Sequence, residues 1–234
     1  QGAPIRLFVM GKNQWRDEYE WPLARTQFTT YYLHSSGSAN TLYGDGMLTL
    51  SKPGEETPDH YSYDPLNPCP SSTGEPLRSL MQDQRILQKR DDVLVYTMPA
   101  VEKETEITGP IYAELYASSS ALDTDFVARV SIVHRDGYNW KLGAKLVRAR
   151  YRNGEKAEAL VPGQIYKFRI EAANTSIVLQ PGETIRLDVT SALYPDADRN
   201  MNTFGRIGFD SAEDAVVAHQ TIYHDAEHPS ALIL

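Results

Sequence analysis

Asp123 and Asp125 are the residues of this sequence whose type and spacing come nearest to a catalytic pair. They flank a single threonine, and two carboxylates held close together are the groups that cleave glycosidic bonds. Acids at the start of a strand, however, more often accept hydrogen bonds from backbone amides and hold a turn. We therefore expect a structural role for both residues, in which they accept hydrogen bonds from backbone groups or arginines.

A pair of histidines near the end of the chain resembles part of a zinc motif. His224 and His228 are four residues apart, so on a helix they would share one face. The motif H-E-x-x-H needs a glutamate directly after the first histidine, and Asp225 stands there instead. Pro229 follows and would end a helix. We predict a polar connector without a metal.

Asp196, Asp198 and Asn200 have the spacing with which a calcium loop begins, D-x-D-x-N. The glycine that should come next is replaced by Met201, so we predict no metal at this site either. We expect a structural loop in which charged side chains satisfy backbone groups or each other. Arg199 and Asn200 are its candidate structural residues.

The sequence contains no recognisable nucleophile. The elbow G-x-S-x-G of serine hydrolases is absent, and the nearest approach, Ser36-Gly37-Ser38, has the wrong glycine spacing and predicts a turn. There is no glycine-rich phosphate loop, and a single cysteine, Cys69, excludes an internal disulfide. The sequence therefore predicts no catalytic residue, no metal and no cofactor in this chain.

Length and charge limit the kinds of protein and partner. The chain has 234 residues, which suits one large all-β domain, since sandwiches commonly contain ~200–250 residues. The net charge of −8 argues against a nucleic-acid partner. No apolar run reaches the ~18 residues of a membrane span, and no signal peptide is visible, which favours a soluble, cytoplasmic protein. The chain begins Gln1-Gly2, so we expect a segment of a longer protein.

The elements that must position these residues are strands. Residues 111–151 show three runs of period-two alternation separated by turn signals. Asp136-Gly137 is a hairpin signal, because glycine adopts a positive φ without steric cost. In the third run the alternation changes phase, which predicts a β-bulge near Leu146. We expect three consecutive antiparallel strands, the last of which ends at Tyr151.

Further strands show the same alternation, and a proline-rich stretch interrupts them. Strands are predicted at residues 5–10, 28–34, 47–50, 93–97, 165–172, 185–190 and 216–223. Residues 15–22 are expected to form an aromatic and charged loop. Residues 51–81 contain six prolines and are expected to form a long ordered excursion or a linker. Short strands at roughly 8–15-residue spacing with little helix predict an all-β, jelly-roll sandwich.

Short motifs spread along nearly the whole chain carry a family resemblance. They are LFVMGKNQWRDEYEWPLART (7–26), DQRIL (83–87), RDDVLVYT (90–97), TGP (108–110), SSSALDTDF (118–126), RDG (135–137), RARYR (148–152), PG before YKFRI (162–170), YPDADRNMNT (194–203) and IYHDAEHPSALIL (222–234). In this order and spacing they resemble the C-terminal domain of cocaine esterase-like (CocE/NonD) acyl hydrolases. X-prolyl dipeptidyl peptidases and α-amino-acid ester hydrolases belong to the same class.

The resemblance implies a galactose-binding-like jelly roll over residues 1–234. It implies that the catalytic serine, aspartate and histidine lie upstream, in an α/β-hydrolase domain that this chain lacks. The chain would then be a non-catalytic accessory domain that packs on the catalytic domain and helps to wall the substrate pocket. The parent protein is expected to be a serine hydrolase that acts on small carboxylic esters, amides or X-Pro dipeptides.

The resemblance also assigns roles to particular residues. The loop 73–83 is the part expected to reach the substrate pocket, and Leu77, Leu80 and Met81 are its candidate substrate contacts. Trp15 and Trp21 are expected on the face toward the catalytic domain.

Two other roles are compatible with the sequence. One is an independent carbohydrate-binding jelly roll, which an exposed aromatic platform beside polar side chains would favour. The other is an oligomerisation domain, and a homo-oligomer is therefore a possible assembly. A flat apolar patch near the first two tryptophans would instead favour the interdomain face.

Overall fold

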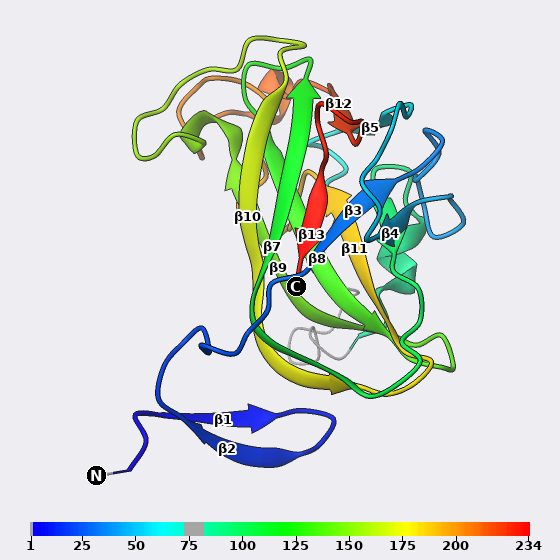
Figure 1. The fold of residues 1–234 in the computed structure, drawn as a ribbon. Helices are drawn as coiled ribbons and strands as arrows, with labels where there is room; N and C mark the ends of the chain where they lie inside the picture. Colours follow the sequence, from blue (N-terminus) through cyan, green and yellow to red (C-terminus); the bar gives the residue numbers. More distant parts are fainter. Residues whose placement is uncertain (1, 73–81) are drawn as a thin grey trace.

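The computed structural model describes residues 2–72 and 82–234, and most of its regular structure is β-strand (Figure 1). The strands are β1 Ile5–Val9, β2 Gln14–Glu18, β3 Thr30–His34, β4 Met47–Thr49, β5 Asp59–Tyr63, β6 Leu94–Thr97, β7 Thr105–Ser119, β8 Asp125–Val133, β9 Asn139–Arg148, β10 Tyr166–Leu179, β11 Thr184–Thr190, β12 Ala218–Tyr223 and β13 Ala231–Ile233. The helices of the described residues are short 3-10 turns, η2 Gln84–Lys89, η3 Ala149–Tyr151 and η4 Ala212–Asp214. The predicted all-β class is therefore confirmed.

The strands form two layers that pack face to face. Hydrogen-bonded neighbours follow the order β5-β12-β7-β13-β3-β4-β6-β11-β8-β9, and β10 pairs with β7. In Figure 1, β10, β7, β13 and β3 lie in front, whereas β8, β9 and β11 lie behind them. The layers meet in the core, where the rings of Phe126 on β8 and Phe168 on β10 lie 4.6 Å apart. This arrangement confirms the predicted jelly-roll sandwich, and the galactose-binding-like assignment stays a prediction.

The core follows the period-two alternation of the sequence. On β7, Ile111, Ala113 and Leu115 are fully buried, because successive side chains of a strand point to opposite faces. The outward side chains of β8 are buried as well, since the segment between β5 and β6 covers them. Arg129, for example, donates from Nη2 to the carbonyl oxygen of Pro70. Strand β8 is thus enclosed on both of its faces.

The β-bulge that the sequence predicted near Leu146 lies four residues earlier, so the predicted position is wrong. On β8, Val130 pairs with Gly143, but the next residue, Ser131, pairs with Lys141. Leu142 is therefore the extra residue of the bulge. The position follows from close packing, because a Cβ on Gly143 would lie 2.6 Å from the carbonyl oxygen of Ala172 on β10. The strand also ends at Arg148 rather than at residue 151, because η3 turns the chain from Ala149 onward.

The loop predicted at residues 15–22 is also wrong, because its first half forms a strand. β2 pairs with β1 as an antiparallel hairpin, in which Phe8 lies opposite Trp15. The connecting turn uses two positive φ angles, 80° at Gly11 and 54° at Asn13. In Figure 1 this hairpin lies apart from the sandwich. It is attached through Met10, whose amide nitrogen lies 2.9 Å from the carbonyl oxygen of Ser176.

The proline-rich excursion at residues 51–81 contains a strand that the sequence reading missed. β5 pairs with β12 and stands at the end of the strand order. Pro58 and Pro65 flank the strand, and an edge position tolerates the missing amide donors of such neighbours. The period-two pattern of a strand was visible in the sequence, because Tyr61 and Tyr63 alternate with polar residues. In the structure both tyrosines are buried.

Candidate functional site

The N-terminal hairpin and the residues directly after it expose several large aromatic side chains, which we call the hairpin surface. The exposed fractions are 40% for Phe8, 61% for Trp15, 78% for Tyr19 and 36% for Trp21. Monomeric proteins seldom leave such rings in water as a group, and apolar patches of this kind mark interaction sites. The hairpin surface is therefore the strongest candidate for a docking face.

The two tryptophans predicted for an interdomain face differ in their surroundings. Trp15 packs edge-on against Phe8, with 5.3 Å between ring centroids, and the guanidinium of Arg6 lies 5.5 Å from its ring. Trp21 donates from Nε1 to Oδ1 of Asn174 at 3.3 Å, which ties its indole to β10. Trp15 thus presents most of its ring outward, whereas Trp21 is partly fixed to the sandwich.

An ion-pair network fixes the hairpin relative to β7. Glu18 is buried and accepts hydrogen bonds from Arg25, and its carboxylate also lies 2.6 Å from Nε of Arg16. The hydrogen bonds from Arg25 lower the pKa of Glu18 below its usual value. Arg16 in turn donates to both carboxylate oxygens of Glu106, at 3.0 and 2.7 Å. Such bidentate pairs fix orientation as well as distance.

A groove of about 1090 Å³ lies beside this network. Its walls come from the segment that follows the hairpin, from the connection between β6 and β7, and from the start of β7. Leu23, Tyr31 and Val101 supply apolar lining, and Arg25 and Glu106 supply charge. Arg25 and Glu106 belong to the ion-pair network, so the groove adjoins the base of the hairpin.

The carboxylates of Asp123 and Asp125 are buried among hydrogen-bond donors. Asp123 accepts from the backbone amide of Arg150 at 2.8 Å and from its Nε at 2.6 Å. Asp125 accepts from Nε and Nη2 of Arg148 at 2.9 and 3.0 Å, and Nδ2 of Asn200 donates to both acids at 2.9 Å. Burial raises the pKa of Asp125, and Arg148 opposes that rise. With these partners, neither acid is placed to transfer a proton to a substrate.

The remaining residues of the calcium-like stretch point in different directions. Arg199 does not join the aspartate pair, since it donates to the carbonyl oxygen of Pro65 at 3.3 Å and lies over the ring of Tyr194. Asp198 contributes its backbone carbonyl, which accepts from Arg148 at 2.9 Å. Within residues 2–72 and 82–234, no group of three or more His, Cys, Asp or Glu side chains is arranged to hold a metal.

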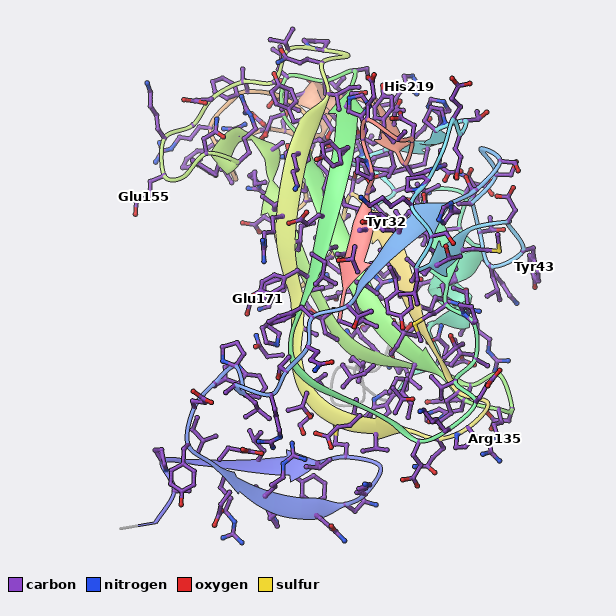
Figure 2. All side chains as sticks on the ribbon, viewed as in Figure 1. Tyr32, Tyr43, Arg135, Glu155, Glu171 and His219 are labelled. Carbon is purple, nitrogen blue, oxygen red and sulfur yellow. The ribbon has the colours of Figure 1, made fainter. Side chains whose placement is uncertain are left out.

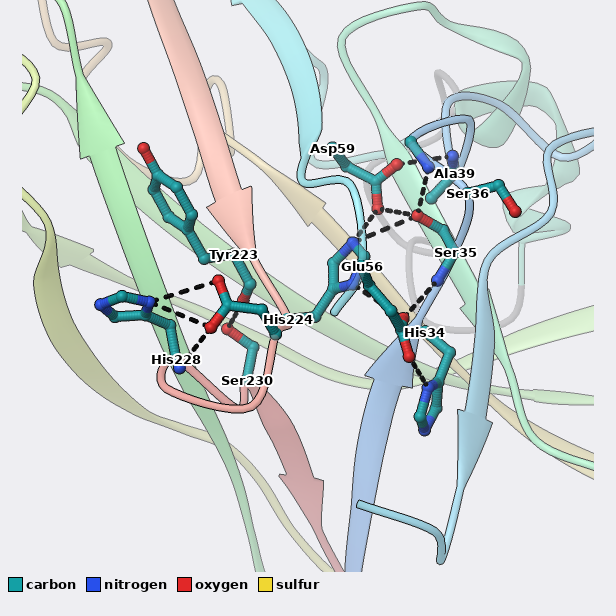
Figure 3. Close-up of polar contacts among 12 residues, drawn as sticks. His34, Ser35, Ser36, Ala39, Glu56, Asp59, Tyr223, His224, His228 and Ser230 are labelled. Carbon is teal, nitrogen blue, oxygen red and sulfur yellow. Dashed lines mark hydrogen bonds and ion pairs between the residues drawn. The ribbon is translucent and has the colours of Figure 1, made fainter. Parts of the chain in front are cut away.

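A buried cluster that sequence reasoning missed lies where the ends of β3 and β12 meet (Figure 3). Nε2 of His224 lies 3.1 Å from Oγ of Ser35, and its Nδ1 lies 3.1 Å from Oε2 of Glu56. This is the order of a Ser-His-Glu triad. His34 completes the group, with Nδ1 at 2.7 Å from Oε1 of Glu56.

The chemistry of this cluster excludes a catalytic triad. A fourth group, Asp59, accepts a hydrogen bond from Oγ of Ser35 at 2.7 Å and lies 3.0 Å from Nε2 of His224. Two carboxylates therefore face one imidazole, and Asp59 and Glu56 raise the pKa of His224 despite its burial. The hydroxyl of Ser35 thus already donates to a carboxylate, and the side chain of His224 is fully buried, where a substrate could not reach it. The cluster ties separate segments together.

His228, the second histidine of the predicted polar connector, contacts Asp225, three residues before it. Nδ1 of His228 lies 3.2 Å from Oδ1 of Asp225, which also accepts from the backbone amide of His228 at 2.9 Å. Its ring packs against Tyr116 and Tyr223. Figure 3 shows His224 and His228 in separate groups.

The predicted substrate contacts Leu77, Leu80 and Met81 lie outside the described residues. Of the loop 73–83, the structure describes the last two residues. Asp83 caps η2, and its Oδ1 accepts from the backbone amide of Arg85 at 3.1 Å. The pocket role of this loop stays a prediction.

The exposed face of the front layer carries tyrosines, as a carbohydrate-binding module would require. The guanidinium of Arg169 lies 4.3 Å from the ring centre of Tyr112, and Nζ of Lys167 lies 5.4 Å from that of Tyr116. Figure 2 shows the neighbouring Glu171 pointing outward from β10. One side of each ring is already covered by a cation, so these tyrosines do not form an open stacking platform.

Helices long and apolar enough to cross a membrane do not occur in the part of the chain that the structure describes.

Comparison with known proteins identifies relatives over the full length of the chain. Residues 1–233 match the family model described as the X-Pro dipeptidyl-peptidase C-terminal non-catalytic domain. A cocaine esterase from Rhodococcus sp. (strain MB1 Bresler) is 42% identical over 239 residues, which cover 100% of this chain and 42% of that protein.

Solved structures with the same fold are also those of larger proteins. An aminopeptidase from a marine sediment archaeon, Thaumarchaeota archaeon, superposes with a TM-score of 0.88 at 28% identity, covering 100% of this chain and 40% of its own. An α-amino acid ester hydrolase gives a TM-score of 0.86 at 26% identity, covering 98% and 40%. This chain spans about two fifths of the length of these relatives.

Proposed function

The chain belongs to the family of X-Pro dipeptidyl-peptidase C-terminal non-catalytic domains, and we propose that residues 1–234 form one accessory domain of a serine acyl hydrolase. The catalytic serine, histidine and acid belong to an α/β-hydrolase domain that precedes it in the same polypeptide. The substrate is a small ester or amide, as the names of the cocaine esterase and the α-amino acid ester hydrolase suggest for relatives. The domain packs on the catalytic domain and completes one wall of its pocket.

The observation that carries this proposal is the hairpin surface. Trp15 and Tyr19 expose 61% and 78% of their surface, although burying a large aromatic ring releases on the order of 2–3 kcal/mol. In the complete protein, we expect the hairpin surface to be buried against the catalytic domain.

The pocket wall is assigned to the loop 73–83. Its Leu77, Leu80 and Met81 would contact the acyl group of the substrate. The described end of this loop supports the assignment, because Asp83 is fixed by its cap on η2, and η2 itself packs on the rear layer through Gln88.

A domain exchange tests the proposed function. In cocaine esterase, the C-terminal region that matches this chain at 42% identity is replaced by residues 1–234. We expect the exchanged protein to hydrolyse an activated ester at a rate within about tenfold of the parent. The 234-residue chain alone should show no turnover and no labelling by a serine-directed probe, and labelling would contradict the proposal.

Variants of the exchanged protein separate docking from pocket formation. Trp15→Ser should weaken the association of the two domains, measured by limited proteolysis between them. Tyr43→Ser is the matched control, since Tyr43 is 78% exposed but lies in the connection between β3 and β4. Replacing residues 73–83 with a Gly/Ser loop should change kcat/KM between bulky and small acyl esters. Equal loss for all esters would exclude a pocket role for the loop.

A further inference from the structure

The outer face of the rear layer carries a set of charged and polar side chains under the segment that connects β5 to β6. We call this set the polar layer. It consists of Arg129, Ser131, Asn139, Lys141, Arg186 and Asp188, which lie side by side on β8, β9 and β11. Arg129 and Asp188 are fully buried, and Lys141 is 6% exposed. The polar layer is independent of the hairpin surface and of the proposed accessory role.

The cations of the polar layer depend mostly on neutral acceptors. Nζ of Lys141 donates to the carbonyl oxygen of Ser71 at 3.1 Å. Nη1 of Arg186 donates to Oε1 of Gln88 at 3.0 Å. Arg129 has the one close carboxylate, since its Nη1 lies 3.5 Å from Oδ2 of Asp188. Oδ1 of Asp188 is taken by Nε2 of Gln88 at 2.8 Å.

Several buried polar atoms in the polar layer lack a hydrogen-bond partner, and they include the acceptors Oδ1 of Asn139 and Oδ2 of Asp188 as well as donors. Nε and Nη1 of Arg129 make no hydrogen bond, and neither do the hydroxyl of Ser131 and the indole nitrogen of the adjoining Trp140. Arg129 is fully buried, so its Nε loses water without a replacement, and its Nη1 keeps only the ion pair with Asp188. Unsatisfied buried donors are uncommon in proteins and call for a partner.

The net charge of the polar layer decides whether the missing hydrogen-bond partner is a water molecule or an ion. Among the residues that the structure describes, three cationic side chains, Arg129, Lys141 and Arg186, share the layer with one carboxylate, Asp188, and the exposed Asp196 acts on Lys141 from the groove. Bound water satisfies donors, but it does not neutralise a buried cationic excess, and an unpaired buried charge is strongly unfavourable. The pair of Asp83 and Arg85 at the edge of the layer adds one charge of each sign. The excess therefore remains positive.

A groove connects the polar layer to solvent. It has a volume of about 550 Å³ and lies between β9, the bulge of β10 and the segment after β11. Lys141 lines it together with Leu193 and Asp196. Burial and the charge of Arg129 lower the pKa of Lys141, and Asp196 acts against that shift. Asp196 is exposed at the groove, whereas Arg129 is fully buried.

We propose that the polar layer binds one small, singly charged anion, a halide or a short carboxylate, between Arg129 and Lys141. The anion accepts hydrogen bonds from the free guanidinium N–H groups and offsets the excess of positive charge. Chloride and formate share this chemistry, because both are small and accept several hydrogen bonds at once. The consequence is a stability that depends on the identity of the anion rather than on ionic strength.

Thermal unfolding of the 234-residue chain provides the first test. The melting temperature is measured at constant ionic strength while sodium gluconate, whose anion is bulky, is replaced by chloride or by formate. Binding at a hundredfold excess over Kd should raise the melting temperature by about 5–10 °C, with saturation. A melting temperature that is the same in all three salts would overturn the proposal and leave water as the partner.

Two lysines on β9 give a matched pair of variants. Lys141→Met removes the buried cation, whereas Lys145→Met removes an exposed one on the same strand. We expect Lys141→Met to lose the chloride-dependent shift while its melting temperature in gluconate stays close to that of the unchanged chain. Lys145→Met should keep the full shift. A full shift in Lys141→Met would place the ion elsewhere and overturn the assignment.

A bromide derivative locates the ion even if Lys141→Met fails to fold. Crystals of the unchanged chain are soaked in sodium bromide, and anomalous scattering gives the bromide positions. An anomalous peak in contact with Arg129 or Lys141 is expected. Peaks at surface lysines only would show adventitious ions and would contradict the proposal.

Discussion

Asp125 illustrates how single residues in this chain join segments that are distant in sequence. It receives two hydrogen bonds from Arg148 and one from Asn200, and its side chain is almost fully buried. Asp125→Ala should lower the free energy of unfolding by about 3 kcal/mol or more, because it leaves a cation without its partner. Asp17→Ala is the control, since Asp17 and Arg6 form an exposed pair at 3.6 Å. Urea unfolding measures both, and equal effects would contradict the prediction.

His224 makes stability depend on pH. Its pKa is raised above 6.5 in the folded chain, so its contribution is fully present below pH 6.5 and is lost as the pH rises through the folded value. The pKa of Asp59 is lowered below 3.8, with hydrogen bonds from His224 and neighbours overcoming burial. That contribution is present above pH 3.8 and is lost as the pH falls through the folded value. The cluster therefore stabilises most between these limits.

The variant His224→Gln tests this dependence. The difference in unfolding free energy between the unchanged chain and the variant should be largest between pH 4 and 6.5, the window set by these two shifts. It should shrink toward alkaline pH, because the imidazolium and its two ion pairs are lost. Urea midpoints at several pH values provide the measurement. A difference that stays constant up to pH 9 would show that His224 contributes through packing alone.

At the scale of single residues, a sequence can indicate only contacts between partners that are close in the chain. The hydrogen bonds within the turn around Asp225 are of that kind. The cluster of His224 was missed because Ser35, Glu56 and Asp59 come from a different third of the sequence. The structural roles predicted for Asp123, Asp125, Arg199 and Asn200 stay predictions until stability is measured.

Among the elements, the bulge of β9 depends on one glycine. A Cβ on Gly143 would lie 2.6 Å from the carbonyl oxygen of Ala172 and 2.7 Å from the Cβ of Ala173. Gly143→Ala should lower the free energy of unfolding by about 1–3 kcal/mol, the usual cost of overpacking. Gly54→Ala is the control, because nothing lies within 4 Å of an added Cβ there. Equal stability of the two variants would exclude close packing as the reason for the bulge.

The elements themselves were predictable to different degrees. Strands with strong alternation, such as β7 and β8, were found because one face is apolar. β2 was read as a loop because its polar sequence, QWRDE, packs on no core, and its order comes from pairing with β1. The bulge was displaced because the contact that causes it, with β10, is not visible in the sequence of β9.

At the scale of the whole molecule, the hairpin and the sandwich should differ in local stability. The hairpin contacts the sandwich through β10 at Met10 and through the ion pairs of Arg16, whereas β8 is enclosed on both faces. Amide hydrogen exchange at β1 and β2 should therefore be at least about tenfold faster than at β8. Binding of a catalytic domain should slow the exchange of the hairpin selectively. Equal protection of the hairpin and β8 in the isolated chain would contradict this expectation.

Because β13 pairs with two other strands of the front layer, it must be synthesised before that layer can close. Residues 231–233 lie between β7 and β3 and pair with both, and the side chain of Leu232 is fully buried. A nascent chain that ends before these residues leaves two strands without a shared neighbour. Folding from the N-terminus onward, as ribosomes deliver many domains, would therefore stop one strand short. The front layer closes only after residues 231–233 have emerged.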